Sequence, residues 1–411
     1  MKRNTCRLCG SQNVEMFLSL GSMPRAGEYL KKEELTKIVK NYPLEVYFCK
    51  HCFSVQLFDI IPRDVLFEDY RYLSSVASKS VLEHFDNYAK EINQNFIKKD
   101  SFLVEIACND GILLKPIKDL GISCIGVDPA TNIIQIGKNK GLEIINDFFG
   151  LETAQKIINS KGQADVIVAN AVFAHVDDMD DLTQGIKILL KPSGVFIFEV
   201  HHLADIIETL QYDSIYHEHF SYHSVLSLSK FLKKYGMEIF DIKKFSIRGG
   251  MIRVYARKID YFHQDKISDS VNDFIKKELD MKLDKFETFE KFGKDVNNHK
   301  KLMLDTLHKF KKQGKKIVAY GMSGRGNTLL NYWNVGTNII DYGIDASPER
   351  YNRYVPGVHI PIIPPENSLN GVDIALLLAW IFADDILKKE KSFTERGGKF
   401  LIPLPHPMLK P

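Results

Sequence analysis

The chain has 411 residues, of which 45% are hydrophobic and 26% charged, and its formal net charge is +3. This length predicts two or three domains, and the composition is typical of a globular protein rather than a disordered one. The small charge is spread along the chain, which argues against nucleic acid or a membrane surface as a partner. Because the sequence shows no secretion signal and no apolar run of membrane-spanning length, we expect a cytoplasmic protein that acts on a small molecule.

Two CxxC pairs open the sequence, Cys6 with Cys9 and Cys49 with Cys52. A two-residue spacer lets a tight turn aim two thiolates at one ion, so the two pairs can supply four tetrahedral ligands. We therefore predict a structural zinc site in a small domain over residues 1–68. Two redox-active or simply buried pairs remain the alternative, since 39 residues separate the pairs.

Strand and helix patterns alternate from residue 69 to residue 260, through the apolar runs "FLVEIACNDG", "CIGVDP", "ADVIVANAV" and "GVFIFEVHH". This alternation predicts a doubly wound parallel sheet of the Rossmann type, which binds ligands at the carboxyl ends of its strands. A lysine-rich amphipathic helical connection is expected over residues 261–312, and a second, smaller Rossmann-like domain over 313–411. The predicted fold class is thus α/β with three domains.

The first strand ends carry groups suited to an adenosyl cofactor. After Glu105, the turn through Asn109 to Gly111 can present backbone amides to a ligand, and Asp128 can accept hydrogen bonds from ribose hydroxyls. Positions 107–110 lack the glycines of a dinucleotide fingerprint. This favours S-adenosylmethionine, which has no pyrophosphate for the backbone to approach. An ordinary strand-to-helix turn is the alternative.

Later strand ends extend this cofactor hypothesis. In "NDFF", Asn146 precedes Asp147, which could bond the adenine amine, and Phe148, which could pack on the ring; either phenylalanine of the motif could instead be core. Asn170 stands where the sheet would meet the cofactor. His175 could face the substrate or be structural.

A second glycine-rich turn, "GMSGRGNTLLN" at residues 321–331, ends a strand of the C-terminal domain. Such a turn can bind a phosphate. The alternative is a domain retained for its shape, which closes over the substrate.

The stretch "DSIYHEHFSYH", residues 213–223, gathers three histidines around Glu218. A metal site is disfavoured, because His217 and His219 would point apart on a helix, and on a strand they would still need a third ligand. An acid/base centre and a polar loop without chemistry remain the two alternatives for this stretch. His217 and His223 are expected to be structural.

The motifs "CRLCG", "EIACNDGILL", "IYHEHFSYHS", "GGMIRVYARK" and "PGVHIPI", in this order, resemble the S-adenosylmethionine-dependent nucleotide-sugar C-methyltransferases, in particular those acting at C-3′ of TDP-amino-keto-sugars. The resemblance covers nearly the whole chain. It implies a zinc-binding domain, a methyltransferase domain, and a C-terminal domain that contacts the nucleotide-sugar. It also implies methyl transfer, through an enolate, to a carbon beside the keto group of a nucleotide-linked 4-keto-6-deoxysugar.

The resemblance also assigns roles to individual residues. Tyr72 would border cofactor and substrate, with Tyr70 as the competing choice. The catalytic group would comprise His219 as the base, Glu218 and Tyr216 as its neighbours in the site, and His175 as a hydrogen-bond donor to the enolate oxygen.

The sequence departs from the family pattern at Ala107–Cys108, where Gly–Ser is usual, at Arg248, where histidine is frequent, and at Met251, where serine is common. The last two changes leave the sugar and the methylated carbon open. Two other functions also stay open: a sugar O-methyltransferase, and a non-catalytic zinc-knuckle adaptor or nucleic-acid binder. We expect the protein to be a monomer.

Overall fold

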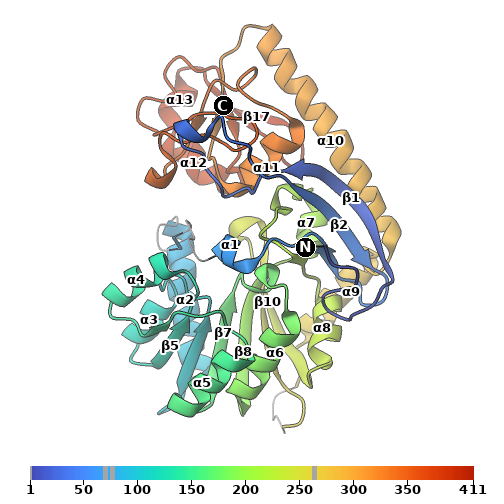
Figure 1. The fold of residues 1–411 in the computed structure, drawn as a ribbon, viewed down its shortest axis with the longest axis vertical. Helices are drawn as coiled ribbons and strands as arrows, with labels where there is room; N and C mark the ends of the chain where they lie inside the picture. Colours follow the sequence, from blue (N-terminus) through green and yellow to red (C-terminus); the bar gives the residue numbers. More distant parts are fainter. Residues whose placement is uncertain (1, 68–72, 75–78, 262–265) are drawn as a thin grey trace. The chain divides into compact units, whose positions relative to one another are not determined.

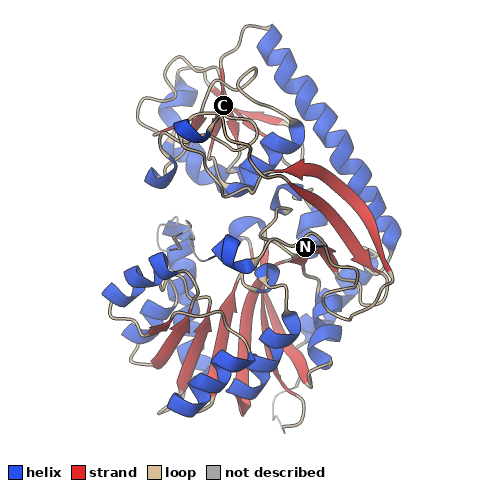
Figure 2. Ribbon diagram, viewed as in Figure 1, coloured by secondary structure: helices blue, strands red, loops and turns tan. Residues whose placement is uncertain are grey.

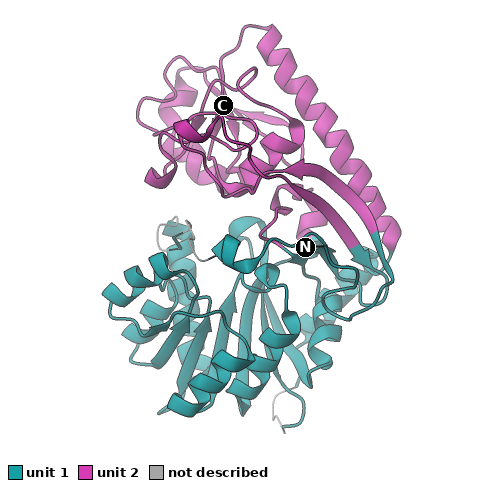
Figure 3. Ribbon diagram, in the orientation of Figure 1, with its two compact units in different colours: residues 1–15, 48–204, 220–285 teal, residues 16–47, 205–219, 286–411 magenta. Residues whose placement is uncertain are grey.

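A computed structural model describes residues 2–67, 73–74, 79–261 and 266–411. The chain forms two compact units: residues 1–15, 48–204 and 220–285 make the first, and residues 16–47, 205–219 and 286–411 make the second (Figure 3). The short segments 16–47 and 205–219 thus join the C-terminal sequence in one unit. No helix in the described part of the chain is long and apolar enough to span a bilayer.

A seven-stranded sheet forms the centre of the first unit (Figure 1). Its five consecutive parallel strands are buried apolar runs, as expected for a sheet with helices on both faces (Figure 2). Two antiparallel strands complete one edge. In spatial order the strands are β10 (Met237–Phe245), β11 (Met251–Lys258), β8 (Leu190–His201), β7 (Ala164–Asn170), β4 (Phe102–Ile106), β5 (Ser123–Val127) and β6 (Ile144–Ile145).

This strand order places a switch point between β4 and β7. From β4 the chain winds outward through β5 and β6, and it then returns to the other side through β7 and β8. Ligands of open α/β sheets bind where the winding direction reverses, beyond the carboxyl ends of the strands. Glu105 lies near the end of β4 and Asn170 ends β7, so both predicted cofactor residues lie at this point.

Helices and short strands surround the sheet. The pairing of β3 (Val55–Leu57) with β9 (Ser221–Tyr222) is antiparallel. The helices of this unit are α1 (Arg63–Phe67), α2 (Lys79–Phe96), α3 (Leu114–Asp119), α4 (Thr131–Asn139), α5 (Leu151–Lys161), α6 (Met179–Leu189), α8 (Val225–Lys233) and α9 (Asp269–Asp280), with the 3-10 turns η2 (Phe173–His175) and η4 (Ile247–Gly249).

The second unit is built on a six-stranded sheet, again Rossmann-like. Its central strand β12 pairs in parallel with β13 on one side and β15 on the other, so it has its own switch point. The spatial order is β14 (Ile362–Ile363), β13 (Gly343–Ile344), β12 (Ile317–Tyr320), β15 (Ile374–Leu377), β16 (Lys399–Ile402) and the antiparallel β17 (Met408–Lys410). The predicted α/β class with two Rossmann-like sheets is confirmed.

The helices of the second unit include the lysine-rich segment. That segment is helical as predicted, in α9 of the first unit and the 27-residue α10 (Phe286–Lys312) of the second. The inner face of α10 carries Phe289, Phe292, Val296, Met303 and Leu307 at helical spacing, and its lysines lie on the other faces. The unit also contains η1 (Lys32–Glu34), α11 (Gly324–Trp333), η5 (Pro348–Arg350), η6 (Trp380–Phe382), α12 (Ala383–Lys389) and α13 (Lys391–Glu395).

Three elements run across or along the unit boundaries. The neighbouring strands β1 (Val14–Met23) and β2 (Tyr42–Cys49) lie mostly in the second unit. The first two residues of β1 and the last two of β2 belong to the first unit, and β2 ends at Cys49. The helix α7 (Leu203–Glu208) crosses the boundary at residues 204 and 205. Segment 205–219 also contains η3 (Tyr212–Ser214), which overlaps the start of the histidine-rich stretch 213–223.

Candidate functional site

Four cysteines of the first unit converge as the CxxC spacing predicts. The thiol sulfurs of Cys6, Cys9, Cys49 and Cys52 all lie within 4.8 Å of one another, with Cys6 and Cys52 3.5 Å apart and Cys9 and Cys49 3.6 Å apart. Four thiolates about 2.3 Å from one zinc ion stand roughly 3.8 Å apart, so the four sulfurs match a closed tetrahedral site. In the described part of the chain this is the sole cluster that could hold a metal ion, and His51 is exposed outside it.

Polar groups around the sulfurs support a structural ion. The Gln56 amide donates to the Cys6 sulfur at 3.1 Å, and the Ser54 hydroxyl lies 3.2 Å from the same sulfur. Such N–H and O–H groups stabilise thiolate charge and fix the orientation of a ligand. With four sulfurs, no coordination position is left for water, which indicates a structural rather than a catalytic zinc.

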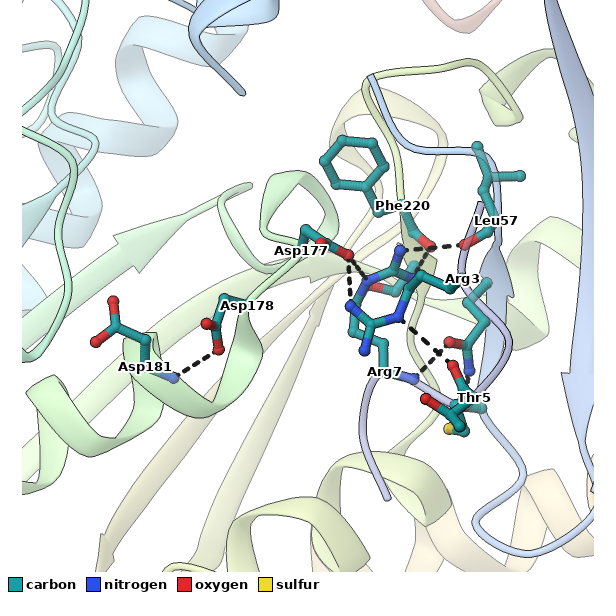
Figure 4. Close-up of polar contacts among 12 residues, drawn as sticks. Arg3, Thr5, Arg7, Leu57, Asp177, Asp178, Asp181 and Phe220 are labelled. Atoms are coloured by element: carbon teal, nitrogen blue, oxygen red, sulfur yellow. Dashed lines mark hydrogen bonds and ion pairs between the residues drawn. The ribbon is translucent and has the colours of Figure 1, made fainter. Parts of the chain in front are cut away.

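Arg7, inside the first CxxC pair, connects this knuckle with the loop after β7. Its guanidinium is buried and donates to the Asp177 carboxylate at 3.0 Å, the Phe220 carbonyl at 2.8 Å and the Leu57 carbonyl at 3.1 Å. Figure 4 shows that Arg3 converges on the same carboxylate, at 2.9 Å. Sequence reasoning missed Arg7, because no pattern in the sequence distinguishes it from a surface arginine.

The turn after β4 contains three residues with a left-handed backbone conformation. Ala107, Asn109 and Gly111 have φ of 53°, 51° and 87°, and a Cβ on Gly111 would come within 2.1 Å of the Leu142 side chain. Only glycine fits at that position. Ala107 adopts a left-handed conformation, which costs roughly 1 kcal/mol for a residue with a Cβ.

Asp128 and two residues that sequence reasoning missed hold this turn. The Asp128 carboxylate accepts from the backbone amides of Asn109 and Ala130, at 2.8 and 2.9 Å. Ser74 donates its backbone amide to the Asn109 side chain and its hydroxyl to the buried Asp110. Ser74 belongs to the "YRYLSS" stretch, whose Tyr70 and Tyr72 lie outside the described residues.

Glu105 and Asn170 present buried polar atoms at the switch point. One carboxyl oxygen of Glu105 and both polar atoms of the Asn170 amide make no hydrogen bond of normal geometry with the described residues. Burial raises the pKa of Glu105 to about 8, and the neighbouring Asn170 side chain opposes that shift. Buried polar groups are costly without partners, so these atoms fit a polar ligand such as the amino acid or ribose part of S-adenosylmethionine.

The "NDFF" stretch divides between packing and surface contacts. Asn146 is exposed and donates to the carbonyls of Asp128 and Pro129, which stiffens the end of β5. Phe149 packs against the core, whereas the half-buried Phe148 ring lies under the Arg63 guanidinium, 4.3 Å away. The expected packing of Phe148 on the adenine ring stays a prediction.

Asp147 accepts a hydrogen bond from Thr153 at 3.1 Å and faces Lys156 at 3.3 Å. Its predicted bond to the adenine amine also stays a prediction.

His175 belongs to η2, just after β7. The imidazole is half-buried and meets the Phe67 ring edge-on, with centroids 5.6 Å apart. The carbonyl of the preceding residue, Ala174, accepts from the Phe220 amide at 2.6 Å. Arg7 binds both Asp177, two residues after His175, and Phe220, whose amide binds Ala174. The position of His175 therefore depends on the knuckle.

His219, in the second unit, is buried and has a defined tautomer. Its Nδ1 lies 2.7 Å from the Ser214 carbonyl oxygen, which can only accept, so Nδ1 carries the proton. The neutral imidazole then has an unprotonated Nε2, as a general base requires. Tyr216 packs on the ring at 4.1 Å between centroids. The half-buried Glu218 carboxylate lies against Gly27, where a Cβ would stand 3.1 Å from it.

The other histidines of this region are buried among protein groups. His217 contacts the Tyr42 carbonyl at 3.1 Å and His223 lies beside Phe173, and burial lowers the pKa of each to about 4. His202 contacts the Glu278 carboxylate at 2.8 Å. None of them joins a group of possible metal ligands within the described residues. The acid/base role of this region stays a prediction.

Models of three protein families match this chain. A zinc binding domain matches residues 6–67, a methyltransferase domain residues 81–242, and a C-methyltransferase C-terminal domain residues 246–405.

Individual proteins are also similar. C-methyltransferase NovU of Streptomyces niveus is 31% identical over 404 residues, which cover 98% of this chain and 96% of that protein. A ubiquinone biosynthesis O-methyltransferase of Methylobacterium nodulans is 31% identical over 96 residues, 23% of this chain and 38% of that protein. The solved structure of the glycopeptide N-methyltransferase MtfA complexed with (S)-adenosyl-L-methionine covers 46% of this chain and 96% of that chain, with 12% identity and a TM-score of 0.34.

Removing one cysteine ligand tests the zinc site. Cys6→Ser should lower the zinc content from about one ion per chain to near zero and lower the melting temperature, because the ion contributes directly to folding. Metal analysis and thermal unfolding measure both effects. Cys124→Ser, which lies outside the cluster, is the matched control and should keep its zinc. A zinc-free Cys6→Ser protein with unchanged melting temperature would contradict a structural role.

The buried Glu105 carboxyl should make stability depend on pH. Its folded pKa of about 8 lies above the ordinary value of 4.5, so the folded protein holds a proton that the unfolded chain releases. The free energy of unfolding without ligand should therefore fall as pH rises from about 4.5 to about 8. Each unit by which the folded pKa exceeds the unfolded one corresponds to about 1.4 kcal/mol of that fall. Glu105→Gln should flatten this decline in urea denaturation. Parallel curves for the two proteins would show that Glu105 is ionised throughout.

Proposed function

Because this chain belongs to the S-adenosylmethionine-dependent C-methyltransferases, we propose that it methylates a carbon beside the keto group of a nucleotide-linked 4-keto-6-deoxysugar. The hydrogen bond from His219 Nδ1 to the Ser214 carbonyl carries this proposal. Because the members of this family are enzymes, membership favours an enzyme over the alternative of a non-catalytic adaptor.

The proposed chemistry starts with proton removal. A carbon beside a carbonyl loses its proton when a base is close and the enolate oxygen is stabilised. His219 Nε2 takes that proton, since Nδ1 is held by Ser214. His175 donates a hydrogen bond to the enolate oxygen, while Glu218 and Tyr216 orient the sugar beside the base.

The cofactor, when bound, supplies the electrophilic methyl group of its sulfonium. The chain's contribution is to hold reactants in line and to move a proton at His219. Glu105, Asn170 and the turn of residues 107–111 are the groups proposed to hold the cofactor, and Asp128 the group proposed to meet its ribose. The C-terminal Rossmann-like domain is proposed to contact the nucleotide of the substrate.

Product analysis tests carbon against oxygen methylation. The enzyme, S-adenosylmethionine and a 4-keto-6-deoxysugar nucleotide should give a product whose new methyl carbon resonates in the C–CH3 range of the NMR spectrum. A signal in the O–CH3 range would instead favour the sugar O-methyltransferase. Exchange of the hydrogen α to the ketone in D2O would support a carbanion intermediate.

Replacing His219 by asparagine tests the base. In His219→Asn the new side-chain amide can still donate to the Ser214 carbonyl, but it has no group corresponding to Nε2, so turnover should fall about 10²- to 10⁴-fold. Stabilisation by S-adenosylmethionine in thermal unfolding should persist, because the cofactor groups lie in the first unit.

The neighbouring His217 offers a matched control. His217→Gln keeps a donor for the Tyr42 carbonyl and should retain turnover within about tenfold, as a structural residue does. Normal turnover in His219→Asn would remove His219 from the role of base.

A further inference from the structure

The histidine-rich stretch of residues 213–223 begins with a buried aspartate. Asp213 is fully buried, and its carboxylate accepts two hydrogen bonds from Arg325, at 2.9 and 2.8 Å, and one from the Trp380 indole at 2.8 Å. The same guanidinium donates to the Gln211 side chain at 3.0 Å. A buried carboxylate needs such charged and neutral donors to offset its desolvation.

The two donors come from the switch point of the second sheet. Arg325 lies in the first turn of α11, after β12, and Trp380 follows β15, the neighbouring strand on which the winding reverses. In this fold the position usually binds a ligand. Here both side chains donate to the carboxylate of Asp213, so Arg325 of "GMSGRGNTLLN" binds an acidic group of the protein itself.

The aspartate is directly followed by the acceptor that orients His219. Ser214 is the next residue, and its carbonyl oxygen accepts a hydrogen bond from His219 Nδ1 at 2.7 Å. On the other side of Asp213, the Tyr212 hydroxyl accepts from the Trp333 indole and contacts His299, both at 2.8 Å. The two residues that directly precede this carbonyl in the chain are therefore both held by side-chain contacts.

We propose that Arg325 and Trp380 are positioning residues for His219: by clamping Asp213 they hold the Ser214 carbonyl, which sets the tautomer and direction of the imidazole. This inference rests on the proposed role of His219 as the base. It gives the C-terminal Rossmann-like domain a second task besides its proposed contact with the nucleotide.

Two clamp variants test the inference. Trp380→Phe keeps an aromatic ring and removes the indole donor, and Arg325→Lys keeps the charge but loses the two-point contact with the carboxylate. Each should lower kcat about 10- to 100-fold, because a small displacement of a base is costly, while the KM for S-adenosylmethionine stays within about twofold. Trp380→Phe makes the smaller change and serves if Arg325→Lys does not fold.

The matched control is Asp341→Asn, which breaks the Lys311–Asp341 ion pair of the same unit without touching residues 211–219. It should keep its kcat. A comparable fall in this control would show that any loss of stability in the unit lowers turnover, and would overturn the inference.

A spectroscopic readout separates positioning from general damage. With ¹⁵N-labelled histidine, the His219 signal, assigned by its absence in His219→Asn, should report a proton on Nδ1 in the native protein and a mixture of tautomers in the clamp variants. An unchanged tautomer, or a kcat within about twofold of the native value in both variants, would overturn this inference but would leave the proposed base in place. Full turnover of His219→Asn would overturn the proposed base itself, and the inference with it.

Discussion

The buried guanidinium of Arg7 is the contact on which the arrangement of the first unit depends. A charge in this position is costly unless its donors are satisfied, and burial indeed lowers the pKa of Arg7 to about 10 while Asp177 opposes that shift. The three acceptors come from the knuckle strand β3, from the loop that follows His175, and from Phe220. Arg7 can donate to all three acceptors only if the knuckle, the loop after His175 and the chain at Phe220 meet. The zinc site, by fixing the turn that contains Arg7, therefore has an effect beyond its own domain.

A second arginine acts in a similar way in the other unit. Arg325 binds Asp213 just before the "YHEHF" motif, and Arg7 binds the carbonyl of Phe220 just after His219. Along the sequence, the stretch with the proposed base thus has a charged anchor at each end. Such anchors suit a general base, because its rate contribution depends on a fixed distance and direction rather than on affinity.

Much of the cofactor region could be predicted from the sequence because strand ends are visible in it. A parallel sheet brings the carboxyl ends of its strands to one edge, so an acid or amide after an apolar run has a defined place. Glu105 lies near the end of β4 and Asn170 ends β7, and Gly111 is required by its conformation and by Leu142. Asn146 was predicted from the same logic, yet its amide bonds the backbone at the end of β5. Sequence position alone does not say whether a polar side chain turns toward a ligand or back to its own loop.

The sequence by itself determined the residue types and spacings: the four cysteines, the two alternating blocks of strand and helix, and the histidine-rich motif, whose spacing already argued against a metal site. These are local properties, set by the geometry of turns, strands and helices. Only the tertiary structure decided which nitrogen of His219 carries the proton, because the acceptor is a backbone carbonyl that leaves no mark in the sequence. It also decided that Arg325 pairs with Asp213 and Arg7 pairs with Asp177, because the pairing of buried charges depends on which distant segments fold together.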